Sequence, residues 1–217
     1  MFFNEIKMKT LKESILRRPE KGRVAVEQII MDWLKANTKI VGNYTINNDL
    51  TIDVKGTLTI TNKSIKEIPS IINFNKVSGY FDISDCSELV SLRGCPTYVG
   101  LFFTCNNCTD LKSLKGAPDE VGSYFSCMNC NELTSLEGAP KKVGEFFRCT
   151  FCSNLVDLKG APEEVGGNFD CSFCKRLTSL KGCPKRVKNI FQCFDCGRQF
   201  TKDEVKNLCR VKEYIIC

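Results

Sequence analysis

Hydrophobic and polar positions repeat along most of this chain with a strict period, and the same residue types recur at every twenty-second position. The recurring hydrophobic positions are a valine, a phenylalanine and a leucine: Val99, Val121, Val143, Val165 and Val187; Phe103, Phe125, Phe147, Phe169 and Phe191; Leu114, Leu136, Leu158 and Leu180. The spacing holds without insertion from residue 77 to residue 196. Self-similarity at a fixed period of this length is typical of solenoids, in which each repeat buries its hydrophobic side against the next one.

Within one repeat, the segment Asn168–Ser172 predicts a short strand. Side chains alternate between the two faces of a strand, so Phe169 and Cys171 share one face while Asp170 lies on the other. Because phenylalanine and cysteine recur at these positions in each full repeat, their face is expected to be the interior. A turn with glycine and proline separates successive repeats, since glycine permits unusual backbone angles and proline fixes φ. Stacked coils are therefore expected to form a parallel sheet with one strand per repeat.

The N-terminal part of the chain has other patterns. Residues 1–37 are predicted to form a helical N-terminal cap, with apolar residues at helical spacing over Glu5–Leu16 and Val24–Ala36. We expect this apolar stripe to cover the open end of the solenoid, and a membrane-binding or partner-binding helix is the alternative. Residues 38–62 largely alternate apolar and polar positions, which predicts short strands, some forming a hairpin. The segment Leu58–Pro69 resembles a degenerate repeat, so residues 38–76 are assigned to a β-hairpin and a degenerate repeat.

Residues 77–200 hold the repeats, and residues 201–217 are expected to form a small C-terminal cap. A helix is predicted to begin at Thr201, because Glu204 follows it at the spacing of a capping box. The segment Tyr214–Ile216 is predicted to be a short strand.

The pattern F-x-C-x-x-C-x-x-L-T-S-L at Phe169–Leu180 resembles leucine-rich repeats. The repeat length and the proline-containing turn resemble the short repeats of bacterial LPX-type effectors. The sequence VGGNFDC at Val165–Cys171, together with MKTLKESIL at Met8–Leu16, resembles leucine-rich-repeat proteins encoded by tailed phages. The resemblance covers about residues 58–200. It implies an α/β-type solenoid dominated by short parallel β-strands, a leucine-rich-repeat horseshoe with both caps, whose concave face binds protein. The effectors' ubiquitin-ligase domain has no counterpart here, so that activity is not implied.

Composition narrows the classes of function. The chain has 15 Cys and no His. The lack of histidine removes Ser-His-Asp and Cys-His catalysis and every zinc site that contains histidine. The sequence has no apolar run of about 18 residues, the length of a membrane-spanning helix. Its first residues lack the continuous apolar core of a secretory signal. A cytoplasmic location is therefore expected, in the host cytoplasm if the chain is phage-encoded.

Five C-x-x-C pairs mark the repeats: Cys105/Cys108, Cys127/Cys130, Cys149/Cys152, Cys171/Cys174 and Cys193/Cys196. Two such pairs can form a zinc site, and one pair can act in redox chemistry. The repeat favours structural thiols, because Ile83 stands in place of the first cysteine in the first copy, and an apolar substitute indicates packing. No metal or cofactor is therefore predicted. A zinc site formed by Cys193, Cys196, Cys209 and Cys217 is the alternative.

The outward face of the strands is free of the packing constraint and carries the candidate binding residues. The predicted partner-binding residues on the concave face are Tyr80, Phe102, Tyr124, Phe146, Arg148, Met128 and Phe194. Phe151 and Phe173 flank this row. Contiguous exposed aromatic side chains with methionine and arginine are typical of a binding interface. The alternative is that the rings stack on one another and stabilise the sheet.

The net charge is +6, and residues 175–217 carry 11 basic and 4 acidic side chains. The candidate basic patch comprises Lys175, Arg176, Lys185, Arg186 and Lys188. Such a patch would attract nucleic acid or an acidic protein, and a solvated surface without a partner is the alternative.

Together these patterns predict a non-enzymatic, cysteine-rich, protein-binding module. The resemblance to phage proteins implies that the partner is a host protein and that the module counters a host defence system. Nucleic-acid or ribonucleoprotein binding through the basic C-terminal end is the alternative function. An enzyme built on the cysteine pairs is disfavoured, because no polar catalytic group repeats beside them. No membrane partner is expected.

Overall fold

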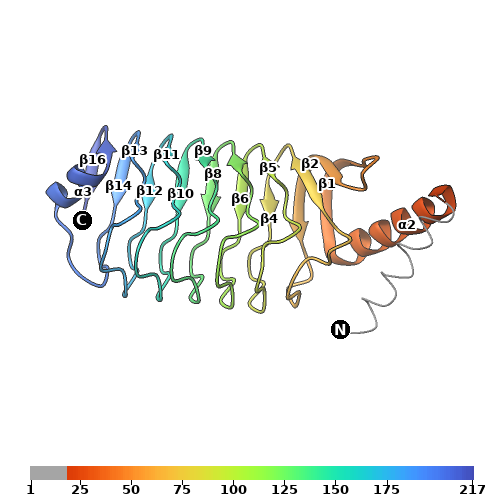
Figure 1. Cartoon of the computed structure of the whole chain (residues 1–217), viewed down its shortest axis with the longest axis horizontal. Coiled ribbons are helices and arrows are strands. Elements are labelled where there is room, and N and C mark those ends of the chain that lie inside the picture. Colours follow the sequence, from red (N-terminus) through yellow and green to blue (C-terminus); the bar gives the residue numbers. More distant parts are fainter. Residues whose placement is uncertain (1–18) are drawn as a thin grey trace.

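The computed structural model describes residues 19–217 and is a parallel β-solenoid of about 8 turns. Figure 1 shows the coils one after another along the long axis, with helix α2 at one end and helix α3 at the other. The helix expected over Glu5–Leu16 lies outside the described residues. The elements are α2 (Pro19–Asn37), β1 (Thr38–Ile46), β2 (Ile52–Ile60), β3 (Phe74–Val77), β4 (Phe81–Asp82), β5 (Tyr98–Val99), β6 (Phe102–Thr104), β7 (Glu120–Val121), β8 (Tyr124–Ser126), β9 (Lys142–Val143), β10 (Phe146–Arg148), β11 (Glu164–Val165), β12 (Phe169–Asp170), β13 (Arg186–Val187), β14 (Ile190–Gln192), α3 (Lys202–Leu208), β15 (Arg210–Val211) and β16 (Tyr214–Ile216).

Each coil contributes two short parallel strands, whereas the sequence pattern predicted one. The Val ladder joins the strands that end in valine, from β3 to β15, and the Phe ladder joins the strands from β4 to β16. Both ladders keep the repeat in register, since Val121 pairs with Val143 and Phe125 pairs with Phe147. The strands of the Val ladder were missed because most of them are too short for period-two alternation to be recognised.

The long strand β2 starts both ladders. Its first half pairs with β3 and its second half with β4, while β1 pairs antiparallel along its other edge. Gly42 and Gly56 face each other in this hairpin at φ +117° and +141°. Residues with a side chain rarely adopt such values. A Cβ at either glycine would overlap the opposite backbone, so the close approach of the two strands requires glycine at both positions. The alternating pattern thus correctly predicted a β-hairpin here.

Helix α2 packs its apolar face against the first coils. Val26, Ile30 and Leu34 recur every four residues, which places them on one face. All three are buried in the same core as the strands. The ring of Trp33 lies 6.5 Å from the ring of Phe74. Among residues 19–217, no helix is long and apolar enough to cross a membrane.

Phenylalanine rings stack along the interior of the Phe ladder. The rings of Phe103, Phe125 and Phe147 are fully buried, and successive centroids lie 5.2 and 5.0 Å apart with interplanar angles of 3° and 14°. The distance follows from the spacing of hydrogen-bonded strands, about 4.8 Å. Each aromatic contact adds about 0.5–1.5 kcal/mol beyond the burial of the ring itself. The recurring phenylalanines, valines and leucines form the interior that the sequence predicted.

The C-terminal segment closes with the predicted helix and strand. Thr201 caps α3, because its hydroxyl accepts the Glu204 N–H at 3.2 Å while its own N–H donates to the Glu204 carboxylate at 2.8 Å. This reciprocal pair is a capping box. Val205 on α3 is buried in the core. Strand β16 covers Tyr214–Ile216, the residues predicted to form it.

Candidate binding surface

Four aromatic side chains form a row on the outward face of the Phe ladder, which we call the aromatic stripe: Tyr80, Phe102, Tyr124 and Phe146. Direct register pairs join Phe102 to Tyr124 and Tyr124 to Phe146. The ring centroids of each pair lie 6.1 Å apart, in edge-on and tilted arrangements. Tyr80, Phe102 and Phe146 nevertheless remain 38%, 44% and 36% exposed. The rings from Phe102 to Phe146 therefore contact one another in sequence, and the stripe still presents apolar surface to solvent.

Arg148 lies next to this stripe on the same strand as Phe146. Its guanidinium carbon is 5.7 Å from the centre of the Tyr124 ring. This is the geometry of a cation–π contact. Its Nε lies 3.8 Å from the Asp170 carboxylate. Met128, the other predicted non-aromatic member, is partly exposed one coil earlier, and its N–H donates to the Asn106 side chain at 2.9 Å.

Three further rings form a second cluster, which we call the aromatic corner: Phe151, Phe173 and Phe194. The rings of Phe151 and Phe173 are parallel at 4.6 Å, and the ring of Phe194 meets Phe173 edge-on at 4.8 Å. Phe151 is 47% exposed. Phe194 was predicted as a member of the concave-face row, and its ring contact is with Phe173.

The backbone at Phe151 and Phe173 is left-handed, with φ of 61° and 62°. Bulky side chains rarely adopt this conformation, whereas Asn and Asp tolerate it. Earlier coils carry Asp85, Asn107 and Asn129 at the same position, where the amide of Asn129 donates to Asn107 at 3.0 Å. The two phenylalanines replace this hydrogen-bonded row with rings on an unfavourable backbone. Residues held in such conformations gather at functional sites. The sequence signal was a change from Asx to Phe at a fixed position of the repeat.

Thr150 and Ser172 directly precede these two phenylalanines and are also unusual. Their hydroxyl oxygens are buried and have no hydrogen-bond partner among the described residues. Nearly all buried polar atoms in proteins form hydrogen bonds. Two buried hydroxyls without a partner, at the same position of adjacent coils, therefore distinguish this corner from the rest of the described solenoid.

The cysteine pairs are packed in the interior and between neighbouring coils. The second cysteine of a pair lies against the preceding coil: the Sγ of Cys130 is 3.2 Å from the Cys105 carbonyl oxygen, and the Sγ of Cys152 is 3.2 Å from that of Cys127. The first cysteine of each pair is buried in the core. Burial raises the pKa of the Cys171 thiol well above its ordinary value. The thiol therefore stays protonated and unreactive near neutral pH.

The four cysteines of the alternative zinc site are only partly brought together. The Sγ atoms of Cys193 and Cys217 lie 3.1 Å apart, whereas Cys196 contacts the Cys171 carbonyl oxygen at 3.3 Å. Burial raises the pKa of Cys209 to about 12. Within residues 19–217, no three or more His, Cys, Asp or Glu side chains are grouped so that they could hold a metal ion.

Most of the predicted basic patch is compensated by acidic side chains of neighbouring coils. The ion pairs are Lys175–Asp195, Lys185–Glu163 and Arg186–Glu164, at 2.5, 3.1 and 3.2 Å. Arg176 instead donates to the Asn154 side chain at 3.1 Å. Three of the five cations therefore have an acidic side chain beside them.

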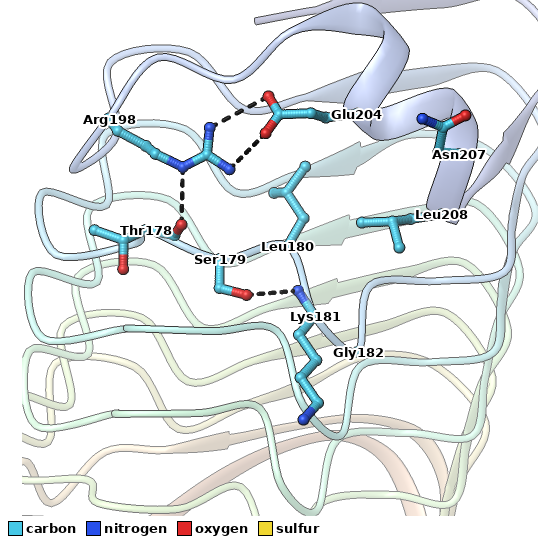
Figure 2. Close-up of a pocket in the computed structure, with 9 residues that line it drawn as sticks. All are labelled: Thr178, Ser179, Leu180, Lys181, Gly182, Arg198, Glu204, Asn207 and Leu208. Atoms are coloured by element: carbon cyan, nitrogen blue, oxygen red, sulfur yellow. Dashed lines mark hydrogen bonds and ion pairs between the residues drawn. The ribbon is translucent and has the colours of Figure 1, made fainter.

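A surface pocket of about 440 Å³ lies between the last repeat and α3 (Figure 2). The guanidinium of Arg198 crosses it and bonds both oxygens of Glu204, at 2.7 and 3.2 Å. Its Nε donates to the Thr178 carbonyl oxygen at 2.9 Å. These bonds hold α3 against the repeat, and the Arg198 guanidinium lowers the pKa of Glu204 to about 2. We assign the pocket a structural role.

Comparison with protein-family models, with curated protein sequences and with solved structures gave no match, so the fold and the surface described above are the basis for inferring function.

Proposed function

We propose that this protein is a non-enzymatic binding module that contacts another protein through the aromatic stripe and the aromatic corner. The observation that carries the proposal is the row Phe102–Tyr124–Phe146 on a regular scaffold, in which Phe102 and Phe146 are exposed and Tyr124 is partly exposed. Protein interfaces are enriched in aromatic residues, and arginine such as Arg148 is common among their energetically dominant residues.

The amount of apolar surface fits the centre of an interface. A phenylalanine or tyrosine side chain buries about 150–250 Å² when fully covered, so the exposed fractions of Tyr80, Phe102 and Phe146 correspond to about 250 Å² in total. A stable interface covers about 800 Å² on each partner. The stripe would therefore form the apolar centre, and polar neighbours such as Asp82 and Thr104 would form part of the rim.

The rigidity of the surface supports the same proposal. Each ring of the stripe from Phe102 to Phe146 contacts the next one, and the strands beneath are fixed by the stacked core phenylalanines. A partner would therefore bind a surface that loses little conformational entropy, which favours affinity.

Finer features belong to this proposal as well. They are the identification of the coils as leucine-rich repeats with a concave binding face, the capping role of α2 and α3, and the cytoplasmic location. The resemblance to phage proteins further suggests a host protein as the partner and a role in countering host defence. Fold alone does not specify function, so these points rest on the resemblance.

A comparative pull-down tests the proposal. Wild-type protein and a Phe102→Ala/Tyr124→Ala/Phe146→Ala variant are used as bait with lysate of the native host. The matched control is Val90→Ala/Tyr98→Ala/Val156→Ala, which removes apolar side chains that are 48%, 38% and 37% exposed and lie outside the stripe. We expect the wild type and the control to retain one common partner and the stripe variant to lose it. Equal recovery by all three baits would refute the proposal.

A further inference from the structure

A column of buried cysteines runs along the interior of the solenoid, directly after the strands of the Phe ladder. In the full repeats, the thiols of this column are directed at the backbone of the following coil. The Sγ of Cys127 lies 3.7 Å from the Arg148 carbonyl oxygen, and the Sγ of Cys171 lies 3.4 Å from that of Gln192. The column therefore holds these thiols by hydrogen bonds to backbone oxygens.

Cys193 has the same position in the next coil, but its thiol has a different partner. Its N–H donates to the Ile216 carbonyl at 2.8 Å, whereas its Sγ lies 3.1 Å from the Sγ of Cys217. Strands β14 and β16 pair in parallel with Gln192 opposite Ile216, so the two cysteines are the next residues on adjacent strands. Figure 1 shows β14 and β16 at the same end of the stack as α3.

The geometry of this pair suits a covalent bond between the two sulfurs. Adjacent strands lie about 4.8 Å apart, which falls within the range of about 4.4–6.8 Å between the Cα atoms of a disulfide. From 3.1 Å, the two Sγ atoms would move about 1 Å closer to reach the S–S bond length of about 2.05 Å. A small side-chain movement is therefore sufficient, and the pairing of the strands is kept.

Other cysteine pairs are directed elsewhere. The C-x-x-C spacing would join Cys193 to Cys196, but the Sγ of Cys196 lies 3.3 Å from the Cys171 carbonyl oxygen of the preceding coil. Contact with Cys130 raises the pKa of Cys105, yet both are fully buried and each thiol has a carbonyl partner, at 3.2 and 3.6 Å. The tertiary contact thus selects a different pair from the one that the sequence motif suggests.

We propose that Cys193 and Cys217 are a redox modification site, at which a small disulfide such as oxidised glutathione converts the two thiols into a disulfide bond. The bond would join the ends of β14 and β16. It would also close the intervening segment, which includes α3, into a loop against the last repeat.

The reaction consists of two thiol–disulfide exchanges. Because Cys193 is 1% exposed and burial raises its pKa, the first attack falls to Cys217. Cys217 gives its proton to solvent, bonds to one sulfur of oxidised glutathione and breaks the S–S bond, which releases one glutathione thiolate. Cys193 then loses its proton and attacks the Cys217 sulfur, which releases the second glutathione thiolate. The two thiolates take up two protons, so two protein thiols are oxidised and one glutathione disulfide is reduced.

Peptide mapping of the full chain tests the proposal. Reduced protein is incubated with oxidised and reduced glutathione at several ratios, free thiols are trapped with a maleimide, and masses are measured before and after trypsin digestion. We expect the protein to lose the mass of two hydrogen atoms and the peptides Asn189–Arg198 and Glu213–Cys217 to be linked. Fragment ions of the linked peptides distinguish Cys193 from Cys196 without any substitution. Excess dithiothreitol should release the two peptides.

Two variants provide matched controls. Cys196→Ser should keep the link, because its thiol is directed at the preceding coil. Cys217→Ser should lose it and leave Cys193 reduced. Peptides that contain Cys105 and Cys130 should stay reduced at every glutathione ratio that oxidises the wild-type pair.

Amide hydrogen exchange measures whether the bond fixes the segment between the two cysteines. The bond would close a loop over a sequence separation of 24 residues, which removes conformational entropy from the opened state. Exchange in α3 should therefore slow by at least about tenfold on oxidation and return to its earlier rate on reduction. In Cys217→Ser, oxidised glutathione should leave exchange in α3 unchanged.

Four results would overturn the proposal. They are a link between Cys193 and Cys196, oxidation of Cys105 and Cys130 at the same glutathione ratio, a mixed disulfide with glutathione that never closes onto Cys193, and a fully reduced chain in excess oxidised glutathione. Unchanged exchange in α3 after complete oxidation would overturn the fixing of this segment.

Discussion

The adjacent residues Phe146 and Phe147 offer a direct test of which strand face is interior and which is available for binding. Phe147 is fully buried between Phe125 and Phe169, with ring centroids 5.0 and 5.4 Å away. Phe146 is 36% exposed and touches only Tyr124 among the aromatic rings of the described residues, at 6.1 Å. Replacing either one by alanine removes the same atoms from the same strand, so chemistry and location are matched.

The expected free energies differ because only one site is enclosed. Phe147→Ala removes a buried ring and leaves a cavity, which costs about 3–5 kcal/mol, and the loss of two stacked contacts favours the upper part of that range. At Phe146 water fills the space and no cavity remains, so only part of the transfer free energy of the ring is lost, about 1–2 kcal/mol. The free energy of unfolding of the two variants is therefore expected to differ by about 2–3 kcal/mol.

Urea unfolding of the wild type and both variants, followed by circular dichroism, measures this difference. For a chain of this length, each kcal/mol lowers the thermal midpoint by about 2–4 °C, so Phe147→Ala should melt about 6–20 °C below the wild type and Phe146→Ala about 2–8 °C below it. Phe146→Ala should in addition weaken partner binding in the pull-down. Equal loss of stability in the two variants, or the greater loss at Phe146, would refute the assignment of the two faces.

Three other changes test the packing of the coils. A Cβ at Gly144 would overlap the backbone oxygen of the preceding coil. Gly144→Ala should therefore lower the free energy of unfolding by about 1–3 kcal/mol. Lys188→Ala, at the same position of a later coil, should be neutral in urea unfolding, and similar effects of the two would contradict the close approach. Burial raises the pKa of Cys183 to about 11. An unfolded thiol has a pKa near about 8.5, so the folded state holds its proton more tightly and stability should fall as pH rises above that value. Urea unfolding under reducing conditions measures this; a flat profile would contradict it, and Cys183→Ala should reduce the slope. Thr201→Ala should cost about 1 kcal/mol through loss of the helix cap, with faster amide hydrogen exchange confined to α3. Unchanged exchange in α3 would contradict the assigned cap.

Much of the candidate surface could be predicted from the sequence, because strict periodicity converts sequence position into spatial position. The register pairs of Phe102 with Tyr124 and of Tyr124 with Phe146 follow directly from the constant length of the repeat. The buried face of the strands could also be predicted from the sequence, since only a packing constraint requires the same apolar residue in every copy.

Other parts of the surface could not be predicted in this way. The left-handed backbone of Phe151 and Phe173 depends on how the chain leaves the strand, and the repeat shows only that a phenylalanine replaces an asparagine there. A count of charges along the chain likewise could not show that Lys185 and Arg186 face acids one coil earlier, so the basic patch as a binding surface stays a prediction.

The sequence by itself determined that the chain is a solenoid, which side chains are buried, and which ones share a row, because these properties depend on period and alternation alone. The tertiary structure decided what depends on contacts between coils. These contacts split each repeat into two strands and place the thiol of Cys130 against a carbonyl of the preceding coil. A hydrogen bond between neighbouring coils requires a particular backbone geometry as well as a register, and only the folded chain fixes that geometry.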